Sequence, residues 1–176
     1  MAAAPVVLVP YDPEWPRQFE AERALLERVL GPWLEGGIHH VGSTAIPGIA
    51  AKPVIDMVAG VRDLEEARAA FEPLAELSYV YAPHRPGIAH HFSKPSDRLP
   101  ERVFGLHLTE PGSDLWRERL AFRDALRVDP ALAADYQALK LRLARKHPAD
   151  EGEYTAGKRE FVARVLAAWG LAPGRR

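Results

Sequence analysis

The feature that most constrains the fold is a pair of short β-type runs that enclose a loop of small residues. Residues 38–42 favour a strand, and residues 43–53 favour a loop. The apolar run 54–58 is typical of a buried strand, yet one acid, Asp56, interrupts it. A charge in a buried strand needs a partner, so the loop and the acid are expected to belong to one site.

The residue types in this stretch are suited to binding phosphate together with a metal ion. Gly42 allows a ligand to approach the backbone closely, and the Ser43 hydroxyl and neighbouring amides, including that of Thr44, can donate hydrogen bonds to phosphate oxygens. Asp56 can then hold Mg²⁺ against those oxygens. Two structural alternatives stay open: a tight turn capped by the hydroxyl, and a buried acid bonded to loop amides.

The rest of the chain predicts an α/β (α+β) fold with a small mixed sheet, flanking helices and a helical C-terminal part. Asp12 and Pro13 are suited to begin a first helix, which Gly36 and Gly37 are expected to end. Asp63 and Glu66 form a capping box before a second helix. We expect one domain over 1–176, with a sheet-containing core at about 5–110 and helices at about 113–170. The further strands are expected near 78–81, 90–93 and 102–109, and the C-terminal helices at 113–128, from 129 onward, and at 150–169.

The histidines offer candidate proton acceptors and metal ligands. Along the strand 102–109, His107 shares a polar face with Gly105 and Thr109, which makes that face a candidate active face. His107 or His40 could act as a general base next to Asp56. A three-histidine metal centre, built from His107 and one member of each pair 39–40 and 90–91, is an alternative that would favour metal-assisted hydrolysis.

Two helical pairs combine an aromatic ring with an ammonium group. Tyr136 and Lys140 are four residues apart, and Tyr154 and Lys158 repeat this spacing, so each pair lies on one helix stripe. If the stripes face inward, the lysines could reach a triphosphate while a tyrosine stacks on a base. The alternative is a solvated or packed face, because lysines generally extend to solvent.

Two further cations are candidates for neutralising phosphate. Lys52 lies in the loop that faces the expected phosphate, although a loop lysine is by default exposed. Arg123 could be a phosphate clamp, or it could pair with a nearby acid such as Asp124 or Asp129.

Composition excludes several classes of function. Lys and Arg total 23 against 24 Asp and Glu, so the formal net charge is -1 and general nucleic-acid binding is not expected. The absence of cysteine excludes disulfides and thiolate sites. No signal peptide or membrane-spanning run is apparent, so we expect a cytoplasmic protein without a membrane partner. Residues 42–52 lack the Gly-Lys-Ser/Thr ending of a P-loop.

Taken together, the motifs resemble the GrpB family, a branch of the nucleotidyltransferase superfamily with a DNA polymerase β-like fold. The resemblance extends over almost the whole chain. It rests on VPYDPEWP at 9–16, HVGSTAIPG at 40–48, KPVID at 52–56, LHL at 106–108, FRD at 122–124 and YTAGK at 154–158.

The resemblance implies attack of a hydroxyl on a nucleotide phosphate, assisted by Mg²⁺ or, as an alternative, Mn²⁺. Superfamily sites use three carboxylates, and the alignment on Gly42 and Ser43 puts Asp56 on the second acid and Val54 on the first. One ligand is therefore missing. His107 lies on the strand where a third acid is sought, and Glu101 and Glu110 are the nearest candidate acids.

Two functions follow from this resemblance. The first is an Mg²⁺-dependent nucleotidyltransferase, or a related phosphoryl transferase, that acts on a small-molecule acceptor. The second is a catalytically degenerate domain that binds a nucleoside triphosphate or a phosphorylated small molecule. In both, Asp56 binds the metal, and the residues that contact the nucleotide are Gly42, Ser43, Thr44, Lys52, Arg123, Tyr136, Lys140, Tyr154 and Lys158.

Overall fold

A computed structural model describes residues 5–97 and 101–172. Its centre is a five-stranded mixed sheet in the order β1-β2-β5-β4-β3, in which β2 and β5 are parallel and the other neighbours are antiparallel. The predicted α+β class with a small mixed sheet is confirmed. The ends of the expected domain range, 1–4 and 173–176, lie outside the described residues. The strands are β1 (Leu34–Val41), β2 (Ile55–Val61), β3 (Val80–Tyr81), β4 (His90–Lys94) and β5 (Phe104–Thr109).

The first helix begins where the sequence predicts but ends earlier. In α1 (Glu14–Leu30), the Glu14 N–H donates to the Asp12 carboxylate at 2.9 Å, as expected of a capping acid. The prediction that Gly36 and Gly37 end this helix is wrong, because both glycines lie inside β1. They adopt φ of 82° and 84°, and the pairing of β1 with β2 shifts register between Leu34 and Ile38.

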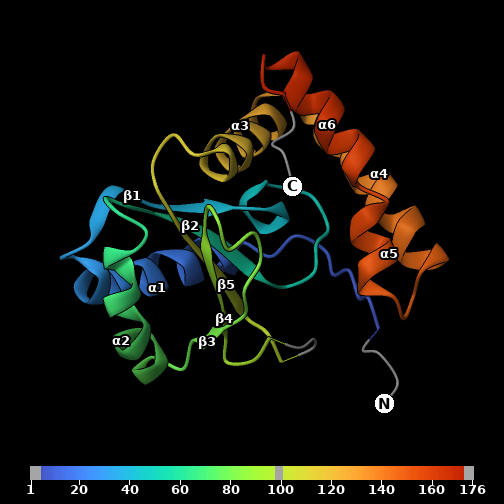
Figure 1. Ribbon diagram of the computed structural model, residues 1–176. Helices are drawn as coiled ribbons and strands as arrows, with labels where there is room; N and C mark the ends of the chain where they lie inside the picture. Colours follow the sequence, from blue (N-terminus) through green and yellow to red (C-terminus); the bar gives the residue numbers. More distant parts are fainter. Residues whose placement is uncertain (1–4, 98–100, 173–176) are drawn as a thin grey trace.

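Helices cover both faces of the sheet, as Figure 1 shows. One face packs against α1, the 3₁₀ helix η2 (Glu66–Ala70) and α2 (Phe71–Glu76), in the largest cluster of buried apolar side chains. The Glu66 N–H donates to the Asp63 carboxylate at 2.8 Å, which is one of the two bonds of the predicted capping box, and the segment that it begins is a 3₁₀ helix followed by a short α-helix. The other face packs against α3 (Asp114–Val128) through Val41, Val58 and Leu115.

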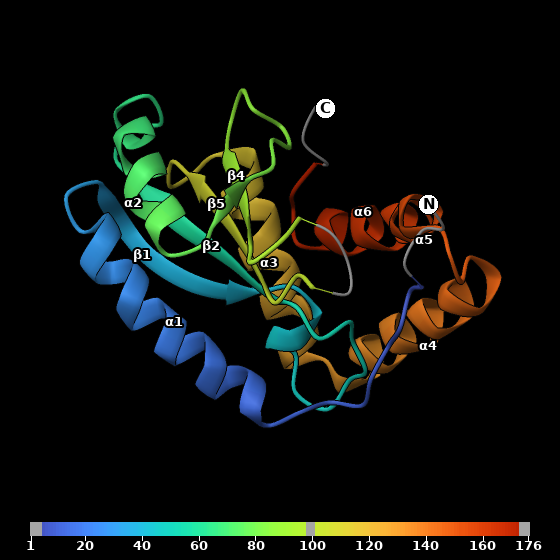
Figure 2. The same cartoon turned by 90° about the horizontal axis from the view of Figure 1, so that it is seen from below.

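The C-terminal helices stand beside the end of the sheet, next to α3 (Figure 2). They are α4 (Pro130–Lys146), α5 (Glu151–Ala156) and α6 (Arg159–Ala168). The helix predicted at 150–169 is therefore two helices, interrupted at Gly157 and Lys158. A Cβ on Gly157 would lie 2.4 Å from Leu143 Cδ2, so this turn packs directly against α4. Within the described ranges, we find no helix that is long and apolar enough to span a membrane.

Candidate functional site

The register of the sheet places Asp56 at the centre of the candidate site. Asp56 pairs with Val41 of β1, the residue before Gly42, and with Gly105 of β5. Because directly paired residues have side chains on the same face of a sheet, the Asp56 carboxylate extends over Gly105 on the face that α3 covers. His107 lies on this face as well, opposite Val58.

The Asp56 carboxylate lies between two glycines. Gly42 has φ 74° and ψ −173°, a region that is essentially restricted to glycine, and a Cβ there would be 2.8 Å from Asp56 Oδ2. A Cβ on Gly105 would be 2.6 Å from Asp56 Oδ1. Asp56 forms no hydrogen bond or salt bridge with any residue in 5–97 or 101–172. The alternative of a structural acid bonded to loop amides is therefore wrong, and both oxygens are available to a ligand.

The turn after Gly42 is a short 3₁₀ helix, η1 (Ser43–Ala45), which side-chain bonds hold in place. The Thr44 hydroxyl donates to the Val54 carbonyl at 3.0 Å and is 2.9 Å from His40 Nε2. The Thr44 side chain therefore attaches the turn to the strands beneath it. As the first two residues of η1, Ser43 and Thr44 have backbone N–H groups without partners inside the helix, and these groups can be offered to an anion.

Helix α4 fixes the loop that follows η1. The buried Lys140 ammonium donates to the Ala50 carbonyl, and the Gln137 side-chain oxygen accepts from the Ala50 N–H. Both polar groups of one loop residue are thus held by a single helix. Burial, with further contributions from Lys158 and Lys52, lowers the pKa of Lys140 to about 7.

Helix α3 holds the same region through two arginines. Arg123 Nε donates to Asp124 at 2.8 Å, and Arg123 Nη1 donates to the His40 carbonyl at 3.2 Å. Arg127 Nε donates to the Ala45 carbonyl at 2.9 Å. Of the two readings of Arg123, the structure shows the ion pair with Asp124.

Two ammonium groups flank one buried aromatic ring. The Tyr154 ring centroid lies 5.3 Å from Lys52 Nζ and 4.3 Å from Lys158 Nζ. Lys52 donates to Glu151 at 2.8 Å, and Arg102 donates to the same carboxylate at 2.6 Å. Burial lowers the pKa of Lys158 to about 7; Lys52 lowers it further and Asp56 acts in the opposite direction.

These groups converge on one cavity of about 900 Å³ between the sheet, α3 and the C-terminal helices. Predicted site residues that line it are Gly42, Ser43, Thr44, Lys52, Asp56, Tyr136, Tyr154 and Lys158. His107, Arg123 and Lys140 are not among the lining residues. Burial raises the pKa of Tyr136 to about 12, and its interaction with Ser43 acts in the opposite direction. Apolar side chains complete the wall: Val54, Phe122, Val162, Ala163 and Leu166.

The histidines divide between the two faces of the sheet. His40 stacks on Phe19 of α1 at 4.9 Å, on the face away from Asp56, so its expected role as a base next to Asp56 is wrong. His107 is buried, and desolvation holds its pKa well below the usual value. Its ring centroid lies 4.4 Å from that of His91, whose Nε2 would be 3.7 Å from a Cβ on Gly105.

A three-histidine metal centre is wrong for the part of the chain that the structure describes. There, no group of three or more His, Cys, Asp or Glu side chains is arranged to hold a metal ion. His39 bonds through Nε2 to the Gly36 carbonyl at 2.8 Å, and His90 bonds through Nε2 to the Leu64 carbonyl at 2.8 Å. Those histidines have structural partners.

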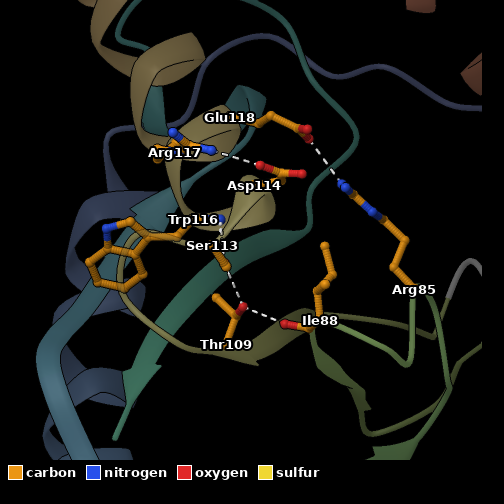
Figure 3. Close-up of polar contacts among 8 residues, drawn as sticks. All are labelled: Arg85, Ile88, Thr109, Ser113, Asp114, Trp116, Arg117 and Glu118. Carbon is orange, nitrogen blue, oxygen red and sulfur yellow. Dashed lines mark hydrogen bonds and ion pairs between the residues drawn. The ribbon is translucent and has the colours of Figure 1, made fainter. Parts of the chain in front are cut away.

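Sequence reasoning missed one wall of the cavity. His84, Arg85, Glu118 and Arg119 all line it, and Arg85 Nη1 donates to Glu118 at 2.9 Å (Figure 3). His84 and Arg85 come from the segment between β3 and β4, and Glu118 and Arg119 from α3. No spacing or motif connects the two segments, so nothing in the sequence could identify them.

The fold and the site define a mixed α+β protein with a cation-lined cavity beside a single strand carboxylate. The chain belongs to the GrpB family, since the family model described as GrpB protein matches residues 5–168. It is similar to the Glutamate-rich protein GrpB of Alkalihalophilus pseudofirmus, with 38% identity over 92% of this chain and 94% of that protein.

One solved structure agrees with this family placement, and another shares the fold. The crystal structure of conserved protein GrpB from Enterococcus faecalis has a TM-score of 0.82 at 27% identity and covers 94% of this chain and 100% of that one. The structure of the GLD-2/RNP-8 complex has a TM-score of 0.57 at 12% identity, covering 94% of this chain and 62% of that one. The second likeness concerns the fold alone.

Proposed function

We propose that this protein is an Mg²⁺-dependent nucleotidyltransferase, or a related phosphoryl transferase, that acts on a small-molecule acceptor. One observation carries the proposal: the Gly42 turn, the unpaired Asp56 carboxylate and the Lys158 ammonium line a single cavity. A carboxylate and an ammonium that share a cavity without a salt bridge are suited to a ligand that brings both an anion and a cation. A nucleoside triphosphate with its metal ion is such a ligand.

The donor set fits one Mg²⁺ ion that the ligand shares. Mg²⁺ commonly binds through one or two carboxylates, substrate phosphates and several waters, and does not require a cage of protein side chains. Asp56 would hold the ion together with phosphate oxygens, because its own oxygens have no partner among the described residues. Bound there, Mg²⁺ would neutralise charge on the transferred phosphate and the leaving oxygens.

The other residues would bind and orient the nucleotide. Gly42 lets phosphate approach the backbone, where the Ser43 hydroxyl and the first amides of η1 can donate to it. Lys52 and Lys158 would neutralise phosphate charge, and the tyrosine between them keeps both ammonium groups in place. Arg123 and Lys140 would act indirectly, since they bond to backbone carbonyls of the strand and loop that carry the site.

The acceptor hydroxyl would attack the phosphorus, form a new P–O bond and release the leaving phosphate group with its electron pair. The hydroxyl proton would pass to solvent or to a base. We propose no direct contact between His107 and the substrate, because its ring does not line the cavity. His107 instead packs against His91, as one of the pair of histidines behind Asp56.

A second candidate function is a nucleotide- or phosphometabolite-binding domain without turnover. Val54, which is buried, stands where the superfamily pattern has the first acid. Within the described residues, Asp56 belongs to no group of three or more His, Cys, Asp or Glu side chains that could hold a metal ion. This shortage of carboxylates favours binding without catalysis.

Nucleotide binding and turnover separate these functions. The purified chain is titrated calorimetrically with each of the four ribonucleoside triphosphates in Mg²⁺ or Mn²⁺, and each mixture is then analysed for released pyrophosphate. Asp56→Asn removes the metal-binding charge, and Asp135→Asn, an exposed residue of α4, is the matched control. Loss of metal-dependent binding in Asp56→Asn alone supports the site. Binding without turnover selects the binding domain, and no nucleotide binding by the unsubstituted chain contradicts both functions.

A further inference from the structure

The cavity has cations on two walls that come from different elements. One set, Lys52 and Lys158, comes from the loop after η1 and from the junction of α5 and α6. The second set, which we call the α3-side cations, consists of Arg85 and Arg119. His84 lines the same wall, but burial and the two arginines lower its pKa and favour the neutral ring. The first set is sufficient to neutralise a single phosphate chain beside Asp56. The second set therefore requires a separate explanation.

Arg85 is held in an uncommon backbone conformation at the cavity wall. Its φ is 54°, in the left-handed region that non-glycine residues seldom occupy. The N–H groups of Ile88 and Ala89 donate to the Arg85 carbonyl at 3.0 and 3.1 Å. Such a conformation persists only where the surroundings enforce it, and it occurs preferentially at functional sites.

The segment that carries Arg85 is attached to the start of α3, as Figure 3 shows. The Thr109 hydroxyl donates to the Ile88 carbonyl and lies 2.8 Å from the Ser113 hydroxyl, the capping group of α3. Arg85 Nη1 donates to Glu118 of the same helix. These contacts fix the Arg85 guanidinium relative to Arg119, the next residue along α3.

The two guanidinium groups retain donors that the protein does not use. Arg85 Nη2 is buried and has no hydrogen-bond partner in the described chain. Arg119 is half-buried and forms no salt bridge or hydrogen bond with a described residue. Arg119 lies close enough to both His84 and Lys158 to lower the pKa of each. Arg119, a member of the second set, therefore lies near Lys158 of the first set as well as near His84.

We propose that Arg85 and Arg119 form a second anion subsite, which selects an acceptor molecule that carries an oxyanion group such as a carboxylate or a phosphate. Guanidinium groups match the planar, two-oxygen edge of such groups better than any other side chain. This inference rests on the proposed function, in which the first subsite holds the nucleotide phosphates beside Asp56. The second subsite then places an acidic acceptor on the α3 side of the same cavity.

Inorganic phosphate is the probe that tests the subsite without a nucleotide. Isothermal titration of the full chain with phosphate is expected to show two sites. Arg119→Gln should weaken one of them by roughly 10-fold or more, as expected for loss of a charge-assisted hydrogen bond. Lys158→Met should weaken the other. Arg117→Gln is the matched control, because Arg117 is exposed on the same helix and pairs with Asp114; it should leave both sites unchanged.

A single phosphate site that is lost in Lys158→Met and unaffected by Arg119→Gln would overturn the inference. Thermal unfolding checks that each variant folds. If Arg119→Gln does not fold, Arg85→Gln takes its place in the same titration. Succinate in place of phosphate distinguishes a carboxylate from a phosphate acceptor.

Titration with ATP and Mg²⁺ keeps the inference separate from the proposed function. If Arg119→Gln weakens ATP binding as strongly as Lys158→Met does, both cations belong to one nucleotide site and the second subsite is refuted. If ATP does not bind at all, while phosphate binding still depends on Arg119, the nucleotide role fails and the α3-side subsite stands.

Discussion

Replacement of Gly105 by alanine adds one methyl group directly against the Asp56 carboxylate. The new Cβ would lie 2.6 Å from Asp56 Oδ1, where real contacts are seldom closer than 3.4 Å. The carboxylate must therefore move by roughly 0.8 Å, several times the tolerance of about 0.2 Å for a metal ligand. Movement in the other direction is limited by Gly42, whose backbone lies on the far side of the same carboxylate.

The expected result is a loss of binding without a loss of folding. Displacement of a metal-binding group typically weakens metal affinity by roughly 10- to 100-fold, which is about 1.4–2.7 kcal/mol. Stability changes little, because alanine is favoured over glycine in a strand by about 0.5–1 kcal/mol, which offsets the strain of moving one carboxylate. Gly105 has no positive φ that alanine would oppose.

The assay combines calorimetric titration of Mn²⁺ in the presence of ATP with thermal unfolding. Gly87→Ala is the control, since a Cβ at Gly87 would have no heavy atom within 4 Å. Unchanged Mn²⁺ affinity in Gly105→Ala, in a folded variant, would refute the reasoning, because it would show that the position of the Asp56 carboxylate does not matter.

Three further predictions concern other parts of the protein. Gly42→Ala and Gly112→Ala should each lower the unfolding free energy by about 1–3 kcal/mol, because both glycines have a positive φ. Only Gly42→Ala should also abolish Mn²⁺-ATP binding in calorimetry, because only its Cβ meets the Asp56 carboxylate. Raising the pH from 6 to 9 should weaken ATP binding as Lys158, with its pKa lowered to about 7, loses its proton, and thermal stability should rise over the same range because the unfolded chain binds this proton more tightly. In Lys158→Met, the pH dependence of ATP binding should be largely absent in titrations, whereas the rise in thermal stability should be reduced but not lost in melts, because the pKa of Lys140 is also lowered to about 7. Glu22→Ala should lower the free energy of unfolding, measured by urea denaturation, by about 3–5 kcal/mol, because it leaves the Lys94 ammonium without its partner at 2.7 Å. An unchanged free energy of unfolding would contradict the importance of this ion pair.

Local signals were sufficient to predict most of the fold. Asp12 and Asp63 each cap a helix as their spacing indicates, and alternation along 104–109 separates an apolar face from a polar one. Gly36 and Gly37 were misread because glycine favours both helix ends and strand bulges, and only the pairing partner decides between them. The interruption between α5 and α6 at Gly157 depends in the same way on packing against α4, which cannot be predicted from a local sequence pattern.

The candidate site was predictable where its residues are close in the sequence or share a helix. Gly42, Ser43 and Asp56 converge because a short connection joins antiparallel neighbours, so the spacing already implies proximity. The wall formed by Arg85 and Arg119 depends on how the segment before β4 meets α3. That contact is a tertiary one between isolated charged residues, for which a sequence has no periodic or motif signature.

The most direct test of the shared cavity is the effect of Mn²⁺ on an ¹H–¹⁵N spectrum of the chain in the presence of ATP. Paramagnetic broadening falls off steeply with distance from the ion. The account predicts that the amide signals of Gly42, Ser43 and Gly105 broaden first, and that Asp56→Asn abolishes this selectivity. Broadening that spares these amides and appears elsewhere, or that is the same in Asp56→Asn, would contradict the account.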